Sequence, residues 1–184
     1  MKRRTILMTA ALLGSAGVCA ATATSAPPEL RSVLPSATLS GSMRFRYWGF
    51  PVYDASLWVQ PGFTSQAFER HGFALQLRYL RDFTNAAITR RSIDEMTRLA
   101  GSPTAERRQL WQRWLQDAFP DVQEGDRISG INRLGDGVLF LTNGRQTGMV
   151  ADAEFARLFF GIWLAAGTSE PAMRQTLLSH SGGS

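Results

Sequence analysis

Hydrophobic side chains recur at every second position from residue 73 to residue 79. The two sets of alternating positions differ in character, with apolar Phe73, Leu75, Leu77 and Tyr79 set against polar Gln76 and Arg78. Successive side chains of a β-strand point to opposite faces, so this period of two predicts a strand, over about 73–83, with one buried face. A buried sheet face needs a second layer to cover it, which places the chain among the layered folds that contain a sheet.

Further strands are predicted on both sides of this one. The aromatic and β-branched stretch 37–59 fits two strands joined at Gly49-Phe50-Pro51, where the alternation is interrupted. Asn143-Gly144 is the dipeptide most typical of a tight hairpin, and it separates the last two strands of a second β-rich block. The strands of this block are expected at 126–133, 138–142 and 145–150.

Helical spacing replaces the period of two between these strand blocks and again after the second. Ile88, Ser92, Met96 and Leu99 stand three and four residues apart, which predicts a helix that ends at Gly101. Ser102-Pro103 is expected to begin a second helix, which runs to Ala118. Two more helices are predicted near residue 152 and from Pro171, and the first of these is too short to span a bilayer.

The N-terminus has the composition of a secretory signal peptide. Lys2, Arg3 and Arg4 precede an apolar stretch, and Ala21-Thr22-Ala23 supplies a cleavage site, so we expect residues 1–23 to be removed on export to the periplasm. The apolar stretch is shorter than the roughly 20 residues of a membrane span, and Val18 does not suit lipid attachment at Cys19. Residues 24–36 are interpreted as an irregular lead-in, 37–180 as a single domain and 181–184 as a flexible tail.

Composition excludes several classes of protein and of site. Hydrophobic residues make up 44% and charged residues 19%, which is ordinary for a globular chain and unlike collagen, coiled coils or disordered proteins. Three of the 20 basic residues lie in the signal peptide, so the remainder nearly balances the 15 acidic residues and no nucleic-acid partner is expected. Arginine and tryptophan residues of 107–114 fit an amphipathic helix better than a nucleic-acid surface.

Residues typical of catalytic or cofactor sites are scarce. The only cysteine lies in the signal peptide, and the two histidines, His71 just before a strand and His180 in the tail, are both expected to be solvated. No metal site is therefore expected, and no histidine-dependent nucleophilic site is predicted. The chain also lacks a P-loop and a G-x-G-x-x-G turn, so no nucleotide cofactor is predicted.

Arginine and tyrosine side chains on the predicted strands are the remaining candidates for binding. A guanidinium beside a phenol in an apolar cleft would suit a carboxylate or phenolate ligand. Alternation of arginine is also common on a solvated sheet face, and the residues alone favour that interpretation. The candidates are Arg44, Arg46, Tyr53, Arg78, Tyr79 and Arg81.

Five motifs in order resemble the bacterial exported branch of the chalcone isomerase-like family, over about residues 39–178. The motifs are Gly49-Phe50-Pro51-Val52-Tyr53-Asp54-Ala55-Ser56-Leu57-Trp58, Leu75-Gln76-Leu77-Arg78-Tyr79, Ser92-Ile93-Asp94-Glu95-Met96, Phe119-Pro120-Asp121-Val122 with Gly125-Asp126-Arg127-Ile128, and Phe159-Phe160-Gly161-Ile162-Trp163-Leu164. The resemblance implies an α+β open-faced β-sandwich, in which helices layer on an antiparallel sheet above a ligand cleft.

The resemblance also implies which residues would catalyse chalcone isomerisation, and the sequence lacks them. The substrate-contacting arginine, threonine and last hydroxyl of the plant enzymes fall near Pro35, Trp48 and Ile162, and the stretch 89–98 contains neither the tyrosine nor the asparagine. Each missing donor would cost on the order of a hundredfold in rate. The family also has non-catalytic members, which resemble fatty-acid carriers, and the resemblance implies that this chain is one of them.

Taken together, these features predict an exported protein that binds a small hydrophobic acid, either acyl or phenolic. It is expected to have no catalytic residues and no cofactor. Arg44, Arg46 and Tyr53 are expected at the polar end of the cleft, with Tyr79 and Arg81 behind them. Arg44 and Arg46 share a strand face, so both line the cleft or both meet solvent. Two alternatives stay open, and the oligomeric state is not predicted.

Each alternative predicts a different cleft. An intramolecular lyase of unknown substrate would place a tyrosine or aspartate with a strongly shifted pKa in a closed pocket. A structural or interaction protein of the cell envelope would have a filled cleft and an exposed apolar patch.

Overall fold

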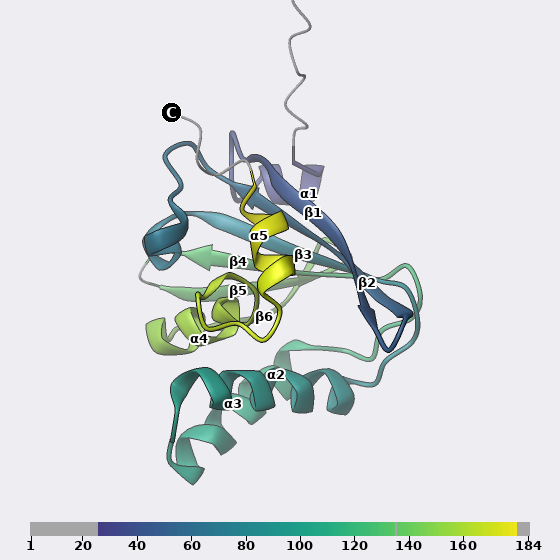
Figure 1. Ribbon diagram of the computed structural model, residues 1–184, viewed down its shortest axis with the longest axis vertical. Helices are drawn as coiled ribbons and strands as arrows, with labels where there is room; N and C mark the ends of the chain where they lie inside the picture. The colour runs from purple at the N-terminus through teal and green to yellow at the C-terminus, as the bar shows by residue number, and fades with distance from the viewer. Residues whose placement is uncertain (1–25, 135, 180–184) are drawn as a thin grey trace, which may run out of the picture.

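Six antiparallel strands form one sheet, in which each strand pairs with its neighbours in sequence (Figure 1). A computed structural model describes residues 26–134 and 136–179, so the predicted signal peptide, His180 and the predicted tail lie outside the described residues. The strands are β1 Thr38–Tyr47, β2 Phe50–Val59, β3 Phe73–Tyr79, β4 Arg127–Arg133, β5 Gly137–Thr142 and β6 Arg145–Val150.

Helices cover one face of this sheet, and the predicted α+β open-faced sandwich is confirmed. Two helices connect β3 to β4 and form the lower layer in Figure 1, while two others follow β6. A short helix precedes β1, and a 3₁₀ helix lies between β2 and β3. The helices are α1 Pro28–Arg31, η1 Ser65–Arg70, α2 Asn85–Ala100, α3 Ala105–Ala118, α4 Ala153–Leu164 and α5 Pro171–Leu177.

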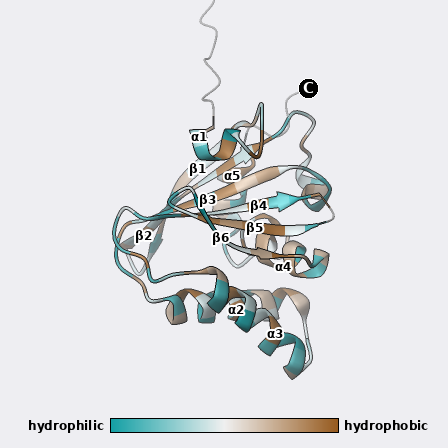
Figure 2. Cartoon of the chain, turned by 180° about the vertical axis from the view of Figure 1, so that it is seen from behind, coloured by the Kyte–Doolittle hydropathy of each residue, from teal (hydrophilic) through white to brown (hydrophobic). Residues whose placement is uncertain are grey.

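The main core lies between the sheet and helices α2 to α5. The apolar positions of β3 face it, as their alternation predicts, and they meet the buried side chains Phe155, Phe159 and Phe160 of α4. In Figure 2 the middle of the sheet and α4 are largely hydrophobic, and hydrophilic stretches lie along α2 and α3. Burial on more than one side of α4 explains why its apolar residues surround most of its circumference.

The opposite face of the sheet has a smaller apolar cluster. Leu30 of α1 is buried there with Trp58, Ala74 and Ile131. The sequence pattern predicts no regular element before residue 37, but the structure has the helix α1 there. Four residues are too few for a periodic pattern, so packing against the sheet and Pro28 at its first turn explain the helix.

Side-chain caps fix where the long helices begin. The hydroxyl of Thr84 accepts a hydrogen bond from the backbone N–H of Ala87 at 3.2 Å and begins α2. Thr104 caps α3 in the same way through the N–H of Arg107. The predicted start of α3 at Ser102-Pro103 is therefore two residues early, because Thr104 and not Ser102 supplies the capping oxygen.

Candidate functional site

A cavity of about 560 Å³ lies between the inner face of the sheet and α2, within the range of roughly 300–1,000 Å³ that small-molecule sites occupy. Its wall consists mainly of aromatic and aliphatic side chains. Strands β1 to β4 supply one side, and α2, α4 and the segment before α5 supply the other. The predicted cleft is thus present as an open cavity and is not filled by side chains.

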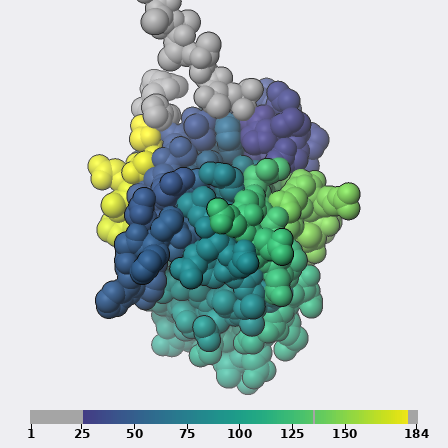
Figure 3. Space-filling model, turned by 90° about the vertical axis from the view of Figure 1, so that its right-hand side faces the viewer, coloured from purple at the N-terminus to yellow at the C-terminus, as the bar shows by residue number. Residues whose placement is uncertain are grey.

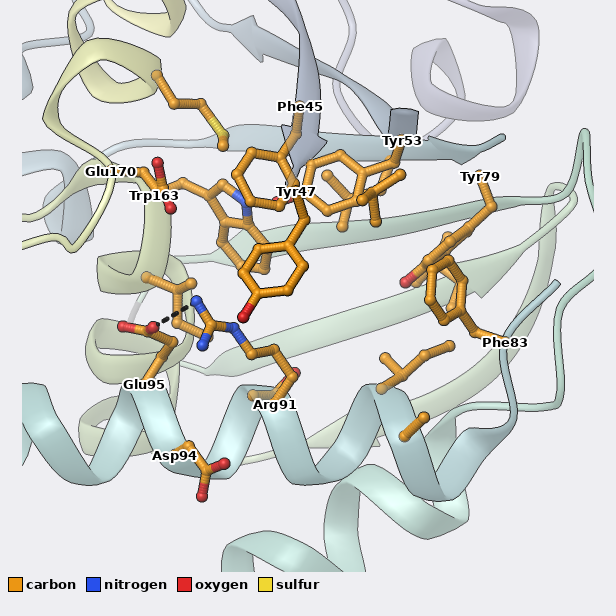
Figure 4. Close-up of a pocket in the computed structure, with 18 of the residues that line it drawn as sticks. Phe45, Tyr47, Tyr53, Tyr79, Phe83, Arg91, Asp94, Glu95, Trp163 and Glu170 are labelled. Carbon is orange, nitrogen blue, oxygen red and sulfur yellow. Dashed lines mark hydrogen bonds and ion pairs between the residues drawn. The ribbon is translucent and has the colours of Figure 1, made fainter. Parts of the chain in front are cut away.

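A row of aromatic rings crosses the sheet side of the cavity. Strand register places Phe45 opposite Tyr53 and Tyr53 opposite Tyr79, so all three share the face that points toward α2. The rings of Phe45 and Tyr53 stack at 5.1 Å, and that of Tyr53 meets Tyr79 edge-on at 6.2 Å. Phe83 extends the row beyond the end of β3. Figure 4 shows these rings above α2.

The two cavity tyrosines are neutral phenols, and burial raises the pKa of both. The Tyr53 hydroxyl accepts a hydrogen bond of 3.1 Å from the indole N–H of Trp163, but loss of solvent outweighs this bond and raises the pKa of Tyr53 far above its usual value. Burial likewise raises the pKa of Tyr79. Both phenols are neutral at physiological pH, so they offer hydrogen-bond donors to a ligand and supply no phenolate base.

Two arginines of α2, Arg90 and Arg91, line the helix side of the cavity, and an ion pair holds Arg91 in place there. The Nη2 atom of Arg91 contacts Oε1 of Glu95 at 2.8 Å, one turn further along the helix. Glu95 is buried and also binds Arg98, whose Nε and Nη2 atoms lie 3.0 and 2.9 Å from Oε2. Glu95 therefore holds Arg91 in place while the other N–H groups of that guanidinium stay available to a ligand.

Three of the five predicted site residues line the cavity, and the predicted placement of Arg44 and Arg46 at its polar end is not observed. Tyr53, Tyr79 and Arg81 are part of the wall. Arg44 and Arg46 share a face, as predicted, but that face points away from α2. Their parity is opposite to that of Phe45, which is directed inward.

The predicted site residues that point away from the cavity make contacts on the outer face of the sheet. Asp54 binds Arg44 at 2.7 Å and Arg78 at 2.8 Å, and hydrogen bonds from both arginines lower the pKa of its carboxyl group. Arg46 donates to the backbone oxygen of Gly49 at 3.1 Å. On the inner side, the guanidinium of Arg81 lies 5.6 Å from the centre of the Phe83 ring, within cation–π range.

Arg91 was not among the residues predicted from the sequence, although a signal for it exists. Glu95 lies three residues after Ser92 and four before Leu99, which places a carboxylate on the apolar stripe that predicts α2. A carboxylate on a buried face needs a cationic partner. The arginines one turn away on either side, Arg91 and Arg98, are the partners in reach.

Metal ligands do not gather at this site. Among residues 26–134 and 136–179, no three His, Cys, Asp or Glu side chains lie close enough to hold a metal ion. The acidic residues of the cavity wall are Asp94, Glu95 and Glu170. Asp94 points away from the sheet in Figure 4, and Glu95 is engaged by arginines.

A family model described as chalcone isomerase-like matches residues 37–179. The chain belongs to the chalcone isomerase-like family. An uncharacterized protein of Haemophilus influenzae is 30% identical over 140 residues, which cover 75% of this chain and 66% of that protein, slightly under two thirds of its length. A fatty-acid binding protein of Arabidopsis thaliana shares the fold, with a TM-score of 0.59 and 12% identity over 78% of this chain and 87% of that one.

Within this chalcone isomerase-like fold, the positions expected for the plant enzymes' substrate contacts carry other chemistry. Trp48 stands at an exposed hairpin tip, and Ile162 presents an apolar side chain to the cavity. The stretch 89–98 belongs to α2, where Arg91 and Glu95 face the cavity. Arg91 and Glu95 therefore face the cavity from the stretch in which the resemblance leads one to expect a tyrosine and an asparagine.

Proposed function

We propose that this chalcone isomerase-like protein binds a small hydrophobic carboxylic acid in the cavity and does not transform it. The observation that carries the proposal is the composition of the cavity wall, which joins an apolar, aromatic interior to the cation Arg91. Such a wall complements a ligand with an apolar chain and one anionic group. The fatty-acid binding protein with the same fold supports this assignment, since fatty acids are hydrophobic carboxylic acids.

Arg91 is proposed to bind the carboxylate at the entrance of the cavity. The Arg91 side chain is 58% exposed, so a ligand carboxylate next to it keeps part of its hydration. The apolar part of the ligand then lies in the cavity against the aromatic rings. The guanidinium already contacts Glu95 through one nitrogen, and Arg98 neutralises Glu95 from the other side. A ligand carboxylate therefore gains hydrogen bonds from Arg91 without leaving Glu95 as an unpaired buried charge.

The lyase alternative gains less support from the same residues. It predicts a strongly shifted tyrosine in the cavity, and Tyr53 and Tyr79 are shifted. The direction of the shift keeps both phenols protonated, so neither supplies a base that could deprotonate a substrate phenol. Neutral phenols and an arginine suit the recognition of a carboxylate better than the activation of a phenol.

Calorimetric titration with a matched pair of ligands tests the proposal. Dodecanoic acid and dodecanol have the same chain and differ only in the head group, so the comparison isolates the contribution of the carboxylate. We expect saturable binding of one dodecanoic acid per chain, with an affinity roughly tenfold above that of the alcohol. Absence of saturable binding by the acid, or equal affinity for both ligands, would contradict the proposal.

We further propose that the protein acts after export to the periplasm. The motif that supports this proposal, in residues 1–23, is a basic start, an apolar stretch and an A-x-A site. Intact-mass measurement on protein from the periplasmic fraction should give a chain that begins at Thr24. An uncleaved chain in the cytosolic fraction would contradict export.

A further inference from the structure

The hairpin between β1 and β2 presents three large aromatic side chains to solvent. Tyr47, Trp48 and Phe50 are 58%, 83% and 65% exposed, and they belong to a turn of four consecutive residues. Figure 3 shows this hairpin, in dark blue, protruding at the lower left of the molecule. Aromatic side chains this exposed and this close together form an apolar surface that a folded protein seldom leaves in water.

Packing within the fold does not explain why a tryptophan, Trp48, occupies the turn between β1 and β2. Trp48 and Gly49 both have positive φ, 52° and 82°, as a two-residue type I′ turn requires. Asparagine followed by glycine is the preferred pair for this turn, and the chain uses that pair at Asn143-Gly144. A bulky side chain in the left-handed region costs free energy, and Trp48 regains little by burial because most of it is exposed.

The same aromatic tip borders the entrance of the cavity. Tyr47, Trp48 and Phe50 all contribute to the cavity wall, together with the more deeply placed Phe45 and Tyr53. In Figure 4 the ring of Tyr47 lies above Arg91, between the sheet and α2. Apolar surface therefore continues from the outside of the hairpin into the cavity.

Charges around the tip favour an anionic partner. Residues 43–53 include Arg44 and Arg46 and no acidic residue, and Arg81 and Arg90 add cations at the cavity rim. The nearest acid of the hairpin, Asp54, is held between two arginines on the outer face. The acidic groups of the cavity wall, Asp94, Glu95 and Glu170, lie on α2 and before α5 and not on the hairpin, and Glu95 is paired with Arg91 and Arg98.

We propose that the β1–β2 tip docks on the surface of a lipid bilayer that contains anionic phospholipids. Tryptophan and tyrosine are the side chains that settle at the interface between headgroups and acyl chains, and arginines beside them attract anionic headgroups. A convex aromatic tip can enter such a soft interface without a shaped counterpart. In this orientation the cavity entrance faces the acyl region, where a hydrophobic acid partitions.

The proposed docking does not require a membrane span. Within the described part of the chain, no helix has the length and hydrophobicity to cross a membrane. Insertion of the aromatic tip and attraction of the arginines to anionic headgroups each contribute weakly to membrane binding. Together they give reversible attachment.

Sedimentation with vesicles free of fatty acid tests the docking independently of the proposed cavity ligand. The vesicles are phosphatidylcholine alone or an equimolar mixture of phosphatidylcholine and phosphatidylglycerol. The tip variant is Trp48→Asn with Phe50→Thr, which restores the preferred Asn-Gly turn and keeps β-propensity, so it should fold. The control variant, Leu134→Asn with Met149→Thr, removes two exposed apolar side chains near the opposite end of the sheet.

The wild-type protein and the control variant should sediment with the mixed vesicles, less so with phosphatidylcholine alone and less at high salt. The tip variant should bind on the order of tenfold more weakly or worse. Failure of the wild type to bind the mixed vesicles would overturn the docking, as would equal binding by the tip variant. Self-association that requires the tip in the absence of vesicles would also overturn it, in favour of a second copy as the partner. None of these results alters the titration with dodecanoic acid.

Discussion

Arg91 owes its place in the cavity to a buried carboxylate. Glu95 is 5% exposed, and such a group must be paired or hydrogen-bonded to remain in a folded protein. Arg98 and Arg91 pair with it from either side along α2, so the glutamate orients both guanidinium groups. The buried carboxylate thereby positions the cation proposed to bind a ligand.

Replacing Arg91 with glutamine should weaken the binding of dodecanoic acid by roughly five- to tenfold. The ligand carboxylate loses a charged hydrogen-bond donor, and partial exposure of this site to solvent limits the size of the loss. Affinity for dodecanol should change little, since the alcohol carries no charge. Calorimetric titration of both ligands measures the difference.

Arg44→Gln is the matched control for this variant. Arg44 has the same charge but lies on the outer face of the sheet, paired with Asp54. Its replacement should leave the affinity for dodecanoic acid unchanged. Equal losses in Arg91→Gln and Arg44→Gln would show that only the overall charge matters and would contradict the assignment of Arg91.

The buried tyrosines predict a specific behaviour at high pH. In the Tyr47→Phe variant the only remaining tyrosines are Tyr53 and Tyr79, whose pKa values burial raises. A raised pKa in the folded state means that their contribution to stability is complete below the unfolded value of about 10 and is lost as the pH rises above it. Phenolate absorbance should therefore appear together with unfolding, as followed by circular dichroism. Phenolate formation near pH 10 in a folded protein would contradict this prediction.

At the scale of elements, turn chemistry and periodicity predicted most of the structure. The Asn143-Gly144 hairpin is confirmed with positive φ at both residues, and β6 has the predicted bounds. The 3₁₀ helix Ser65–Arg70 was not predicted, because its six residues show no apolar period and the backbone is irregular at Ala67. Elements this short depend on tertiary contacts rather than on local sequence.

One close approach between elements gives a direct test of packing. Strand β1 passes α5 at Gly41, where an added Cβ would overlap the backbone oxygen of Thr176. Gly41→Ala should therefore lower the free energy of unfolding by about 1–3 kcal/mol, because β1 and α5 must separate. Chemical denaturation measures the loss. The neighbouring Ser42→Ala, on an exposed position of the same strand, should change the stability by less than about 0.5 kcal/mol, and an equal loss in both variants would contradict the contact.

At the scale of the whole molecule, the sequence predicted which residues share a face but not which face carries the cavity. Alternation correctly grouped Arg44 with Arg46, yet apolar residues occur on both faces, because α1 covers part of the outer one. Tyr53 and Tyr79 were predicted as site residues and line the cavity. Arg91 was missed because its position depends on how α2 packs across the sheet, which helical periodicity alone does not determine.

The crystal structure of the protein with dodecanoic acid tests the central proposal directly, since it reveals both the occupant of the cavity and its orientation. We expect the acyl chain between the aromatic row and α2, with the carboxylate within about 3 Å of a guanidinium nitrogen of Arg91. An empty cavity at saturating acid, or a bound acid whose carboxylate lies away from Arg91 and instead contacts Arg44 or Arg46, would contradict the proposed site.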